Sequence, residues 1–170
     1  NKGQPLPAKI AMSIAHGIIQ ALEYAHNHGV VHGDMKPKNV LLAGEQVKIS
    51  DFGLGRLEGG RVLINIDVPP TLATVRYLAP EQVLGHTIDA RADLYAFGAI
   101  LYELFTGALV FEEVDQEIAE FHRGQPPKPP RALNPRISRP LDHLILKLLD
   151  KDPAKRCATA RQVRLILNSM

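Results

Sequence analysis

The sequence predicts a single, mainly α-helical domain that carries one small β-hairpin. Three observations lead to this prediction. An apolar residue recurs at every fourth position within residues 7–28, a nearly all-apolar stretch fills residues 92–107, and two short β-branched runs flank a turn within residues 39–50. The first pattern is typical of a helix with one buried face, the second of a helix buried on all sides, and the third of a hairpin.

Length and composition fit a globular domain and argue against a nucleic-acid-binding, disulfide-linked or membrane-spanning chain. The chain has 170 residues, is 45% hydrophobic and 22% charged, and is therefore expected to be one soluble globular domain. Its net charge of +2 is too balanced to indicate nucleic-acid binding. The single cysteine, Cys157, excludes an internal disulfide and suits the cytoplasm. No apolar run reaches 18 residues, so no membrane segment is expected in this piece, although its parent chain is compatible with a membrane anchor elsewhere.

The first third of the chain is predicted to form a helix and then the hairpin. The helix covers residues 7–28, and Gly29 stands where a left-handed cap ends a helix. Its apolar positions are Ile10, Ile14, Ile18 and Leu22. Residues 51–78 contain scattered Gly and Pro without a clean period, so they are interpreted as one long loop.

The remainder of the chain is predicted to be helical with one extended connector. Helices are expected over residues 80–84, 92–107, 112–124 and 138–149, and from residue 159 onward. Thr159 and Gln162 have the spacing of a capping box, which marks the start of the last helix. The connector covers residues 125–140, which are rich in Pro and Arg.

A polar cluster interrupts the apolar run "VVHGDMKPKNVLL" at residues 30–42. Asp34, Lys36 and Asn39 share this loop, and Asp51 follows the second strand of the hairpin. Because a hairpin brings its ends together, Asn39 and Asp51 are predicted to be neighbours, and their oxygens suit Mg²⁺. Lys36 adds a cation for a transferred phosphoryl group, and Asp34 is placed to accept a hydroxyl proton. Each residue alone is an ordinary turn former; the combination predicts phosphoryl transfer.

Five motifs occur in an order that resembles a known family. They are "HGDMKPKN" at 32–39, "DFG" at 51–53, "APE" at 79–81, "DLYAFG" at 93–98 and the arginine of "DPAKR", Arg156. Together they resemble the C-terminal helical lobe of a eukaryotic-type serine/threonine protein kinase, with the hairpin beside the catalytic loop. The resemblance covers essentially all of residues 1–170, and the motif sequences are more similar to those of bacterial members than to those of animal signalling kinases. It implies ATP and Mg²⁺ as cofactors and a protein with Ser or Thr as substrate.

The resemblance implies a role for each residue that touches the reaction. Asp34 would be the catalytic base. Lys36 would contact the γ-phosphate of ATP, and its place two residues after Asp34 points to Ser/Thr specificity. Thr74, close to the "APE" motif, would brace both of these side chains.

The implied nucleotide and metal site lies on the hairpin and just after it. Asn39 and Asp51 would hold Mg²⁺, and Lys36 would contact the phosphates. Leu41 would lie under the adenine ring. Gly53 would complete the magnesium motif.

Other residues are implied to support the site. Glu81 would form a buried ion pair with Arg156, and Asp93 would cap the backbone of the catalytic loop. His32 would stack with Phe52 in the apolar spine that joins the two lobes. A structural role is therefore expected for His32, not a role as acid or base.

One position departs from the family pattern. Gly33 replaces the arginine that pairs with a phosphate on the activation segment, residues 51–81. Because a phosphate switch needs a cationic partner, activation through this contact is not expected. "HGD" with Asn39 also resembles aminoglycoside and choline kinases, which phosphorylate small molecules. Those enzymes usually lack the lysine at the position of Lys36 and the "APE" motif, so this alternative is less favoured.

The chain lacks a glycine-rich phosphate loop and the strand lysine of the family. The expectation is that an N-terminal lobe in the same parent chain supplies them and that the isolated lobe is inactive. The alternative is a pseudokinase that serves as an interaction module. The presence of Asp34, Lys36, Asn39 and Asp51 favours the enzyme, because a pseudokinase is free to lose them.

Overall fold

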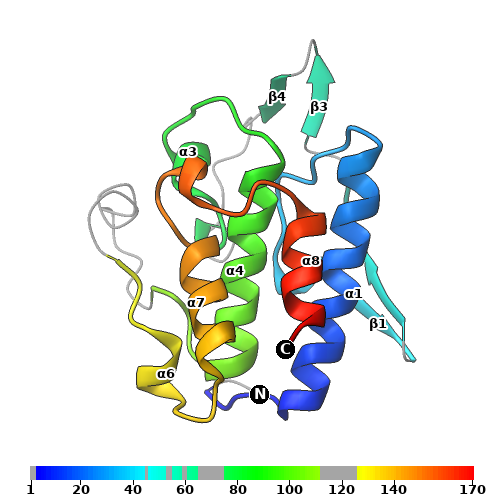
Figure 1. Cartoon of the computed structure of the whole chain (residues 1–170). Coiled ribbons are helices and arrows are strands. Elements are labelled where there is room, and N and C mark those ends of the chain that lie inside the picture. The colour runs from blue at the N-terminus through cyan, green and yellow to red at the C-terminus, as the bar shows by residue number, and fades with distance from the viewer. Residues whose placement is uncertain (1–2, 45, 53–54, 59–60, 65–74, 112–125) are drawn as a thin grey trace.

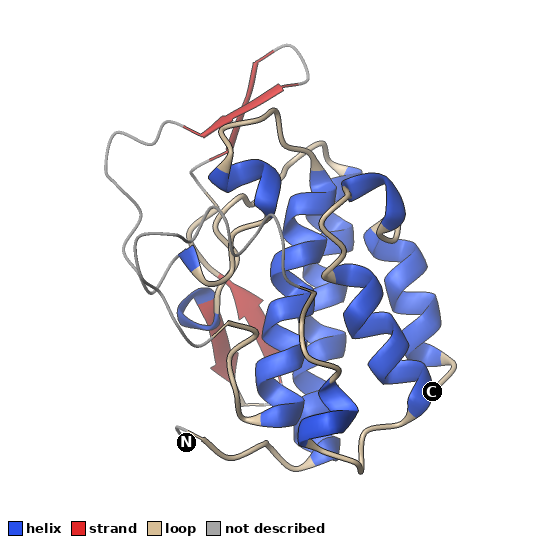
Figure 2. Cartoon of the chain, turned by 90° about the vertical axis from the view of Figure 1, so that its left-hand side faces the viewer, coloured by secondary structure: helices blue, strands red, loops and turns tan. Residues whose placement is uncertain are grey.

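The computed structural model describes residues 3–44, 46–52, 55–58, 61–64, 75–111 and 126–170 (Figure 1). Its longer helices lie side by side: α1 (Ala8–Asn27), α4 (Ala90–Thr106), α7 (Arg139–Leu148) and α8 (Ala160–Asn168). Helix α1 packs against α4 and α8, and α4 packs against α7. The four described strands lie at the margin of this helical body (Figure 2). The predicted fold class, mainly α with a small hairpin, is confirmed.

Helix α1 follows the predicted bounds within one residue at each end, and Gly29 adopts the predicted left-handed conformation with φ 72°. Its buried face includes Ile14, Ile18 and Leu22, but Ile10 is 50% exposed. A spacing of four residues advances 40° too far on each turn of a 3.6-residue helix, so a long row of such positions drifts off the buried face. Ile10, at the end of the row, is therefore not a core residue as its spacing predicted.

Helix α4 is the central element of the core, and most of its side chains are buried, as predicted. It begins two residues before the apolar stretch because Asp89 caps it, accepting the Arg91 N–H at 2.8 Å. Gly98 lets α7 approach closely, since a Cβ at this position would lie 2.7 Å from the Leu148 Cβ. The helix ends at Gly107, whose φ of 74° is left-handed.

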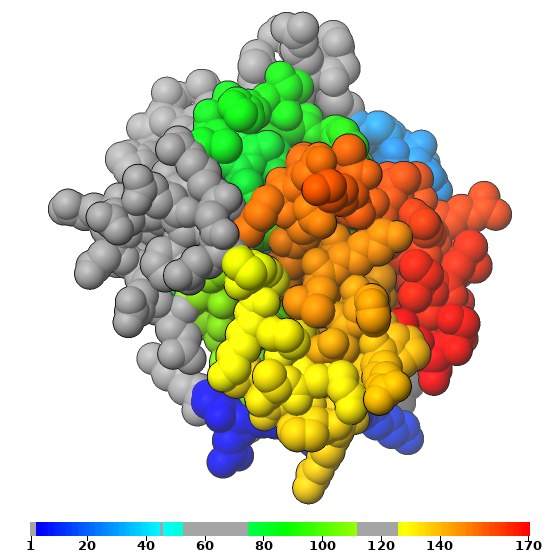
Figure 3. All heavy atoms as spheres, turned by 60° about the vertical axis from the view of Figure 1, so that its left-hand side comes forward, coloured from blue at the N-terminus to red at the C-terminus, as the bar shows by residue number. Residues whose placement is uncertain are grey.

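The two C-terminal helices begin at the predicted caps. Ser138 accepts the Leu141 N–H at 3.3 Å, and Thr159 accepts the Gln162 N–H at 3.1 Å. The Gln162 side chain accepts the N–H of Ala158 at 2.9 Å, one residue before the position that the capping box predicted. In the space-filling view these helices and the segment before them form one continuous face (Figure 3).

Two predictions about irregular segments are wrong in part. The long loop contains a second hairpin, β3 (Gly55–Glu58) with β4 (Arg61–Ile64). The sequence carries Gly59-Gly60 between these strands, a dipeptide common in hairpin connections, and this signal was missed. The connector contains a short helix, α6 (Pro130–Leu133), which starts at a proline whose fixed φ suits a first turn. The helix predicted over residues 112–124 lies outside the described residues.

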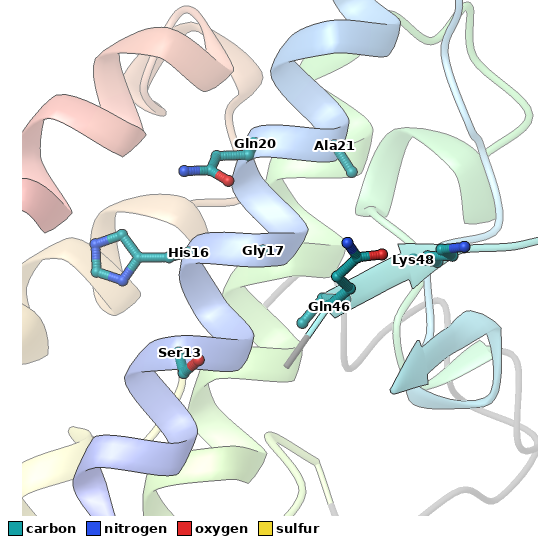
Figure 4. A pocket seen from close by; sticks show the side chains of 8 residues that line it. Ser13, His16, Gly17, Gln20, Ala21, Gln46 and Lys48 are labelled. Carbon is teal, nitrogen blue, oxygen red and sulfur yellow. The ribbon is translucent and has the colours of Figure 1, made fainter. Parts of the chain in front are cut away.

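The hairpin beside the catalytic loop has the predicted position. Strand β1 (Val40–Ala43) pairs with β2 (Gln46–Ile49), and Val40 faces Ile49. Strand β2 lies against α1 at Gly17, where Val47 faces the helix, and residues of both elements, among them Gln20 and Gln46, line a groove between them (Figure 4). A Cβ on residue 17 would lie 2.4 Å from the Val47 Cβ, so the absence of a side chain sets how closely the hairpin approaches α1.

Substituting Gly17→Ala is therefore expected to push the hairpin away from α1. Overpacking of this kind costs about 1–3 kcal/mol, and the better helix propensity of Ala returns about 1 kcal/mol. We expect a net loss of about 1 kcal/mol in the free energy of unfolding, measured by urea titration. Gln20→Ala on the same helix, at an exposed position, is the control and should not destabilise. A Gly17→Ala chain as stable as the control would contradict the contact.

Candidate active site

The predicted catalytic loop, residues 32–39, is held by a carboxylate in the first turn of α4. The backbone N–H groups of His32 and Gly33 donate to the two oxygens of Asp93, each at 2.8 Å. Asp93 is 1% exposed and also accepts from Nε2 of His26, at 2.8 Å, near the end of α1. A buried carboxylate is stable only when its oxygens are satisfied in this way. The role of His26 was missed, because no local pattern links it to a residue 67 positions away.

Gly33 adopts a left-handed conformation, with φ 76°. Most side chains are strained in this region, so the backbone itself favours glycine here. Its carbonyl oxygen accepts a hydrogen bond of 2.7 Å from Nε2 of Gln82. Gln82 belongs to the short helix α3 (Pro80–Val83), which ends the activation segment. Sequence reasoning did not single out Gln82.

Both ring nitrogens of His32 form hydrogen bonds to the backbone. Its Nδ1 accepts the Asp34 N–H at 3.1 Å, so its Nε2 must carry the proton that is donated to the Ser50 carbonyl at 2.9 Å. This is the neutral tautomer, and the residue is 0% exposed. The ring also meets Phe52 edge-on, with 4.7 Å between the centroids. The described contacts thus leave neither ring nitrogen for proton transfer to a substrate.

Asp34 and Lys36 face each other at the centre of the loop. The Lys36 Nζ lies 2.6 Å from Oδ2 of Asp34, and the two side chains are 17% and 12% exposed. Asn39, in the 3₁₀ turn Pro37–Asn39, donates from Nδ2 to the Asp34 carbonyl at 2.9 Å. This bond orients the amide and keeps its Oδ1 available as an oxygen ligand. A carboxylate, an ammonium and an amide oxygen therefore stand on one turn of the chain.

The hairpin carries Asp51 toward this group. The Ser50 N–H donates to the Asn39 carbonyl at 2.9 Å, which continues the pairing of β1 and β2 by one step. Asp51, the next residue, is exposed and has a φ of 60°, unusual for a residue other than glycine. Leu41 on β1 is 50% exposed. Two further residues with sequence-predicted roles, Thr74 and Gly53, lie outside the described residues.

The available donors fit a hard cation that keeps other ligands. Asn39 and Asp51 offer oxygens only, and Mg²⁺ is usually held by few protein oxygens together with phosphate and water. Within the part of the chain that the structure describes, no group of three or more His, Cys, Asp or Glu side chains could hold a metal. Two oxygen donors are fewer than a structural zinc or calcium site provides.

A buried ion pair anchors the end of the activation segment. The Arg156 guanidinium donates to both oxygens of Glu81, at 2.7 and 2.8 Å, and the residues are 4% and 8% exposed. Arg156 also donates to the carbonyls of Asp150 at 2.8 Å and Arg91 at 3.0 Å. One side chain thus joins α3 to the start of α4 and to the segment before the 3₁₀ turn Pro153–Lys155.

Lys151 lies beside this ion pair with a buried amine. Its Nζ has no hydrogen-bond partner among the described residues and lies 4.4 Å from the ring centroid of Phe111. Burial and the neighbouring Arg156 lower the pKa of Lys151 from 10.5 to about 8. Between these values the unfolded chain holds a proton that the folded chain has released, so stability should rise with pH across this window.

Substituting Lys151→Met is expected to stabilise the fold at pH 7, because an apolar group replaces a partly buried ammonium. The contact of the ammonium with the Phe111 ring offsets part of this cost, so we expect a gain of about 1 kcal/mol, or about 3 °C in Tm. The advantage over the wild type should disappear near pH 10, where the native lysine is neutral. Lys155→Met, at an exposed position, is the control in the same thermal scans. No gain at pH 7 would contradict this explanation.

A groove adjoins the catalytic loop. It has a volume of about 760 Å³ and is lined by residues that include Pro37, Leu42 and Leu104. At its wall the Tyr77 hydroxyl donates to Glu103 at 2.6 Å. Burial and this carboxylate raise the pKa of Tyr77, so the hydroxyl stays protonated as a donor. The groove offers a mainly apolar surface next to the loop, with one acidic and one basic side chain, Glu103 and Arg76, in its lining.

Comparisons with known proteins agree with this site. The model of the protein kinase domain matches residues 1–165. Serine/threonine-protein kinase Pkn1 of Myxococcus xanthus is 39% identical over 95% of the chain, and PknB of Mycobacterium leprae is 36% identical over 94%. The chain spans only 24% and 26% of these relatives. The crystal structure of the PknI kinase domain of Mycobacterium tuberculosis superposes with a TM-score of 0.71 at 28% identity, covering 98% of this chain and 56% of that one.

These findings confirm the resemblance that the five motifs predicted, including its bacterial style. A match over residues 1–165 is too extensive to reflect a single shared motif. The loop geometry, the buried ion pair and the capping carboxylate all lie inside the matched region. The chain therefore belongs to the protein kinase family.

Proposed function

We propose that this chain is the C-terminal lobe of a longer kinase that transfers the γ-phosphoryl group of Mg-ATP to Ser and Thr hydroxyls of proteins. The contact of 2.6 Å between Lys36 and Asp34, on a loop whose backbone is fixed by Asp93, is the observation that carries the proposal. Phosphoryl transfer depends mainly on positioning and charge neutralisation, and this loop provides both.

The chemistry follows from the groups on the loop. Asp34 orients the substrate hydroxyl and accepts its proton as the oxygen attacks phosphorus. Lys36 lies beside it and is the cation that would contact the γ-phosphate. Thr74 would brace both side chains, as the family resemblance implies. His32 takes no proton from the substrate, because both ring nitrogens bond within the protein.

The cofactor site is proposed on the hairpin. Protein kinases in general use ATP with a divalent cation. Asn39 and Asp51 would hold Mg²⁺, which would supply charge neutralisation at the phosphates, and Gly53 would complete the magnesium motif. Lys36 would also contact the phosphates. Leu41, half exposed on β1, would lie under the adenine ring.

An N-terminal lobe of the same parent chain would cover this face. Three large apolar side chains on this face are exposed: Leu41 at 50%, Leu42 at 61% and Phe52 at 41%. A group of exposed apolar side chains is typical of a surface that another part of a protein covers. The lobe would supply the phosphate loop and the strand lysine that this sequence lacks. Among the described residues, no helix is both long and apolar enough to cross a membrane. We place the activity in the cytoplasm, without nucleic acid as a partner.

The test is a transfer assay with the full gene product, labelled ATP, Mg²⁺ and a generic protein substrate. We expect label on Ser and Thr after acid hydrolysis, and its loss when EDTA removes the metal. Label on an aminoglycoside or choline in place of protein would overturn the substrate class. A folded chain that transfers nothing would identify a pseudokinase module instead.

A further inference from the structure

A single amide side chain joins the catalytic loop to the end of the activation segment. Nε2 of Gln82 donates to the Gly33 carbonyl at 2.7 Å, and its Oε1 accepts the Ala79 N–H at 2.9 Å. Gln82 is 5% exposed, so both bonds are shielded from water. The two segments that it connects are 49 residues apart in the sequence.

The bond reaches the peptide unit that carries Asp34. The Gly33 carbonyl and the Asp34 N–H belong to the same peptide group. Gln82 holds the carbonyl end, and Nδ1 of His32 holds the N–H end at 3.1 Å. Asn39 holds the next carbonyl, that of Asp34, at 2.9 Å. The orientation of this plane determines where the Asp34 side chain projects, because a planar peptide leaves only two soft angles at each residue.

The helix that carries Gln82 is itself fixed. Glu81, its neighbour on α3, forms the buried ion pair with Arg156. Gly33 has no side chain with which to contact the activation segment. The activation segment is instead connected to the loop by the hydrogen bond from the Gln82 amide to the Gly33 carbonyl. This hydrogen bond needs no phosphate group.

We propose that Gln82 is a positioning residue that aligns Asp34 for phosphoryl transfer by fixing the Gly33–Asp34 peptide to the end of the activation segment. The inference rests on the proposed kinase function and adds a means by which the loop is ordered without activation-segment phosphorylation. Gln82 does not touch substrate; it acts through the backbone of the loop.

Two substitutions at Gln82 distinguish the effect of its hydrogen bonds from the effect of its size. Gln82→Met keeps the length of the side chain and removes both bonds. In the full gene product it should lower kcat about tenfold and leave KM for ATP within about twofold, because a buried carbonyl loses its only described donor. Deuterium uptake at residues 32–39 should rise in the same variant. Gln162→Met is the matched control: it removes a similar glutamine bond to a backbone N–H, at the start of α8, and should leave kcat unchanged.

Gln82→Glu provides a pH readout that a purely structural role would not give. The carboxylate still accepts the Ala79 N–H but repels the Gly33 carbonyl, whereas the protonated acid donates to it. Burial beside a carbonyl should raise the pKa of this carboxyl above its usual value. The ratio of kcat for Gln82→Glu to that of the wild type should therefore rise severalfold between pH 8 and pH 6. The same ratio for Gln82→Met should stay flat.

The outcomes are distinct. A wild-type kcat in Gln82→Met, or a loss that equals its unfolded fraction in a thermal scan, overturns the inference while the kinase function stands. If Gln82→Met does not fold, the pH ratio of Gln82→Glu decides, and a flat ratio overturns the inference. A wild-type gene product that transfers no phosphate overturns the proposed function and this inference with it.

Discussion

An Asp34→Asn variant of the full gene product should transfer phosphate about 10²–10⁴-fold more slowly than the wild type, the range by which a positioned base accelerates proton transfer. The amide has the shape of the carboxylate but accepts no proton. It also removes the negative partner of Lys36, now 2.6 Å from Oδ2. The backbone bonds that Asp34 makes to His32 and Asn39 are unaffected, so the loop should keep its structure.

The measurement is kcat for labelled phosphate transfer, with Tm recorded for the same samples. Asp89→Asn is the matched control, because it makes the same chemical change at the cap of α4, where asparagine also caps well. The control should retain the wild-type kcat. Transfer that survives Asp34→Asn would show that this carboxylate is not the base and that the interpretation of the loop is wrong.

An Arg156→Met variant should lose about 3–5 kcal/mol of folding free energy, as is typical when one partner of a buried ion pair is removed. Glu81 would remain buried at 8% exposure without its two hydrogen bonds. The carbonyls of Asp150 and Arg91 would lose a donor as well. For a chain of this length the loss corresponds to roughly 10 °C in Tm.

Two comparisons make this prediction specific. Arg164→Met removes the solvent-accessible pair with Glu23 between α8 and α1 and should cost much less stability than Arg156→Met, because water screens this pair. The double variant Glu81→Leu with Arg156→Met should recover most of the stability, because no buried charge is left unpaired. Urea unfolding measures all three. A loss in Arg156→Met no larger than in Arg164→Met would mean that the buried pair does not anchor the fold.

Much of the fold was predictable because it is encoded locally. The amphipathic face of α1, the apolar surface of α4 and the caps at Ser138 and Thr159 each depend on residues within about one helical turn. The errors are also local in origin. The two strands on either side of Gly59-Gly60 in the sequence were not predicted, and a proline-rich segment concealed the short helix α6.

The composition of the candidate site was also in the sequence, since Asp34, Lys36 and Asn39 share one loop and the hairpin places Asp51 after it. Only the tertiary structure decided how this loop is held. Gln82 bonds to Gly33 across 49 positions, and His26 bonds to Asp93 across 67. Such pairs leave no periodic pattern, because their partners meet only after α1, α3 and α4 have packed. The sequence by itself thus determined which chemical groups this protein has, and packing decided which of them orient the others.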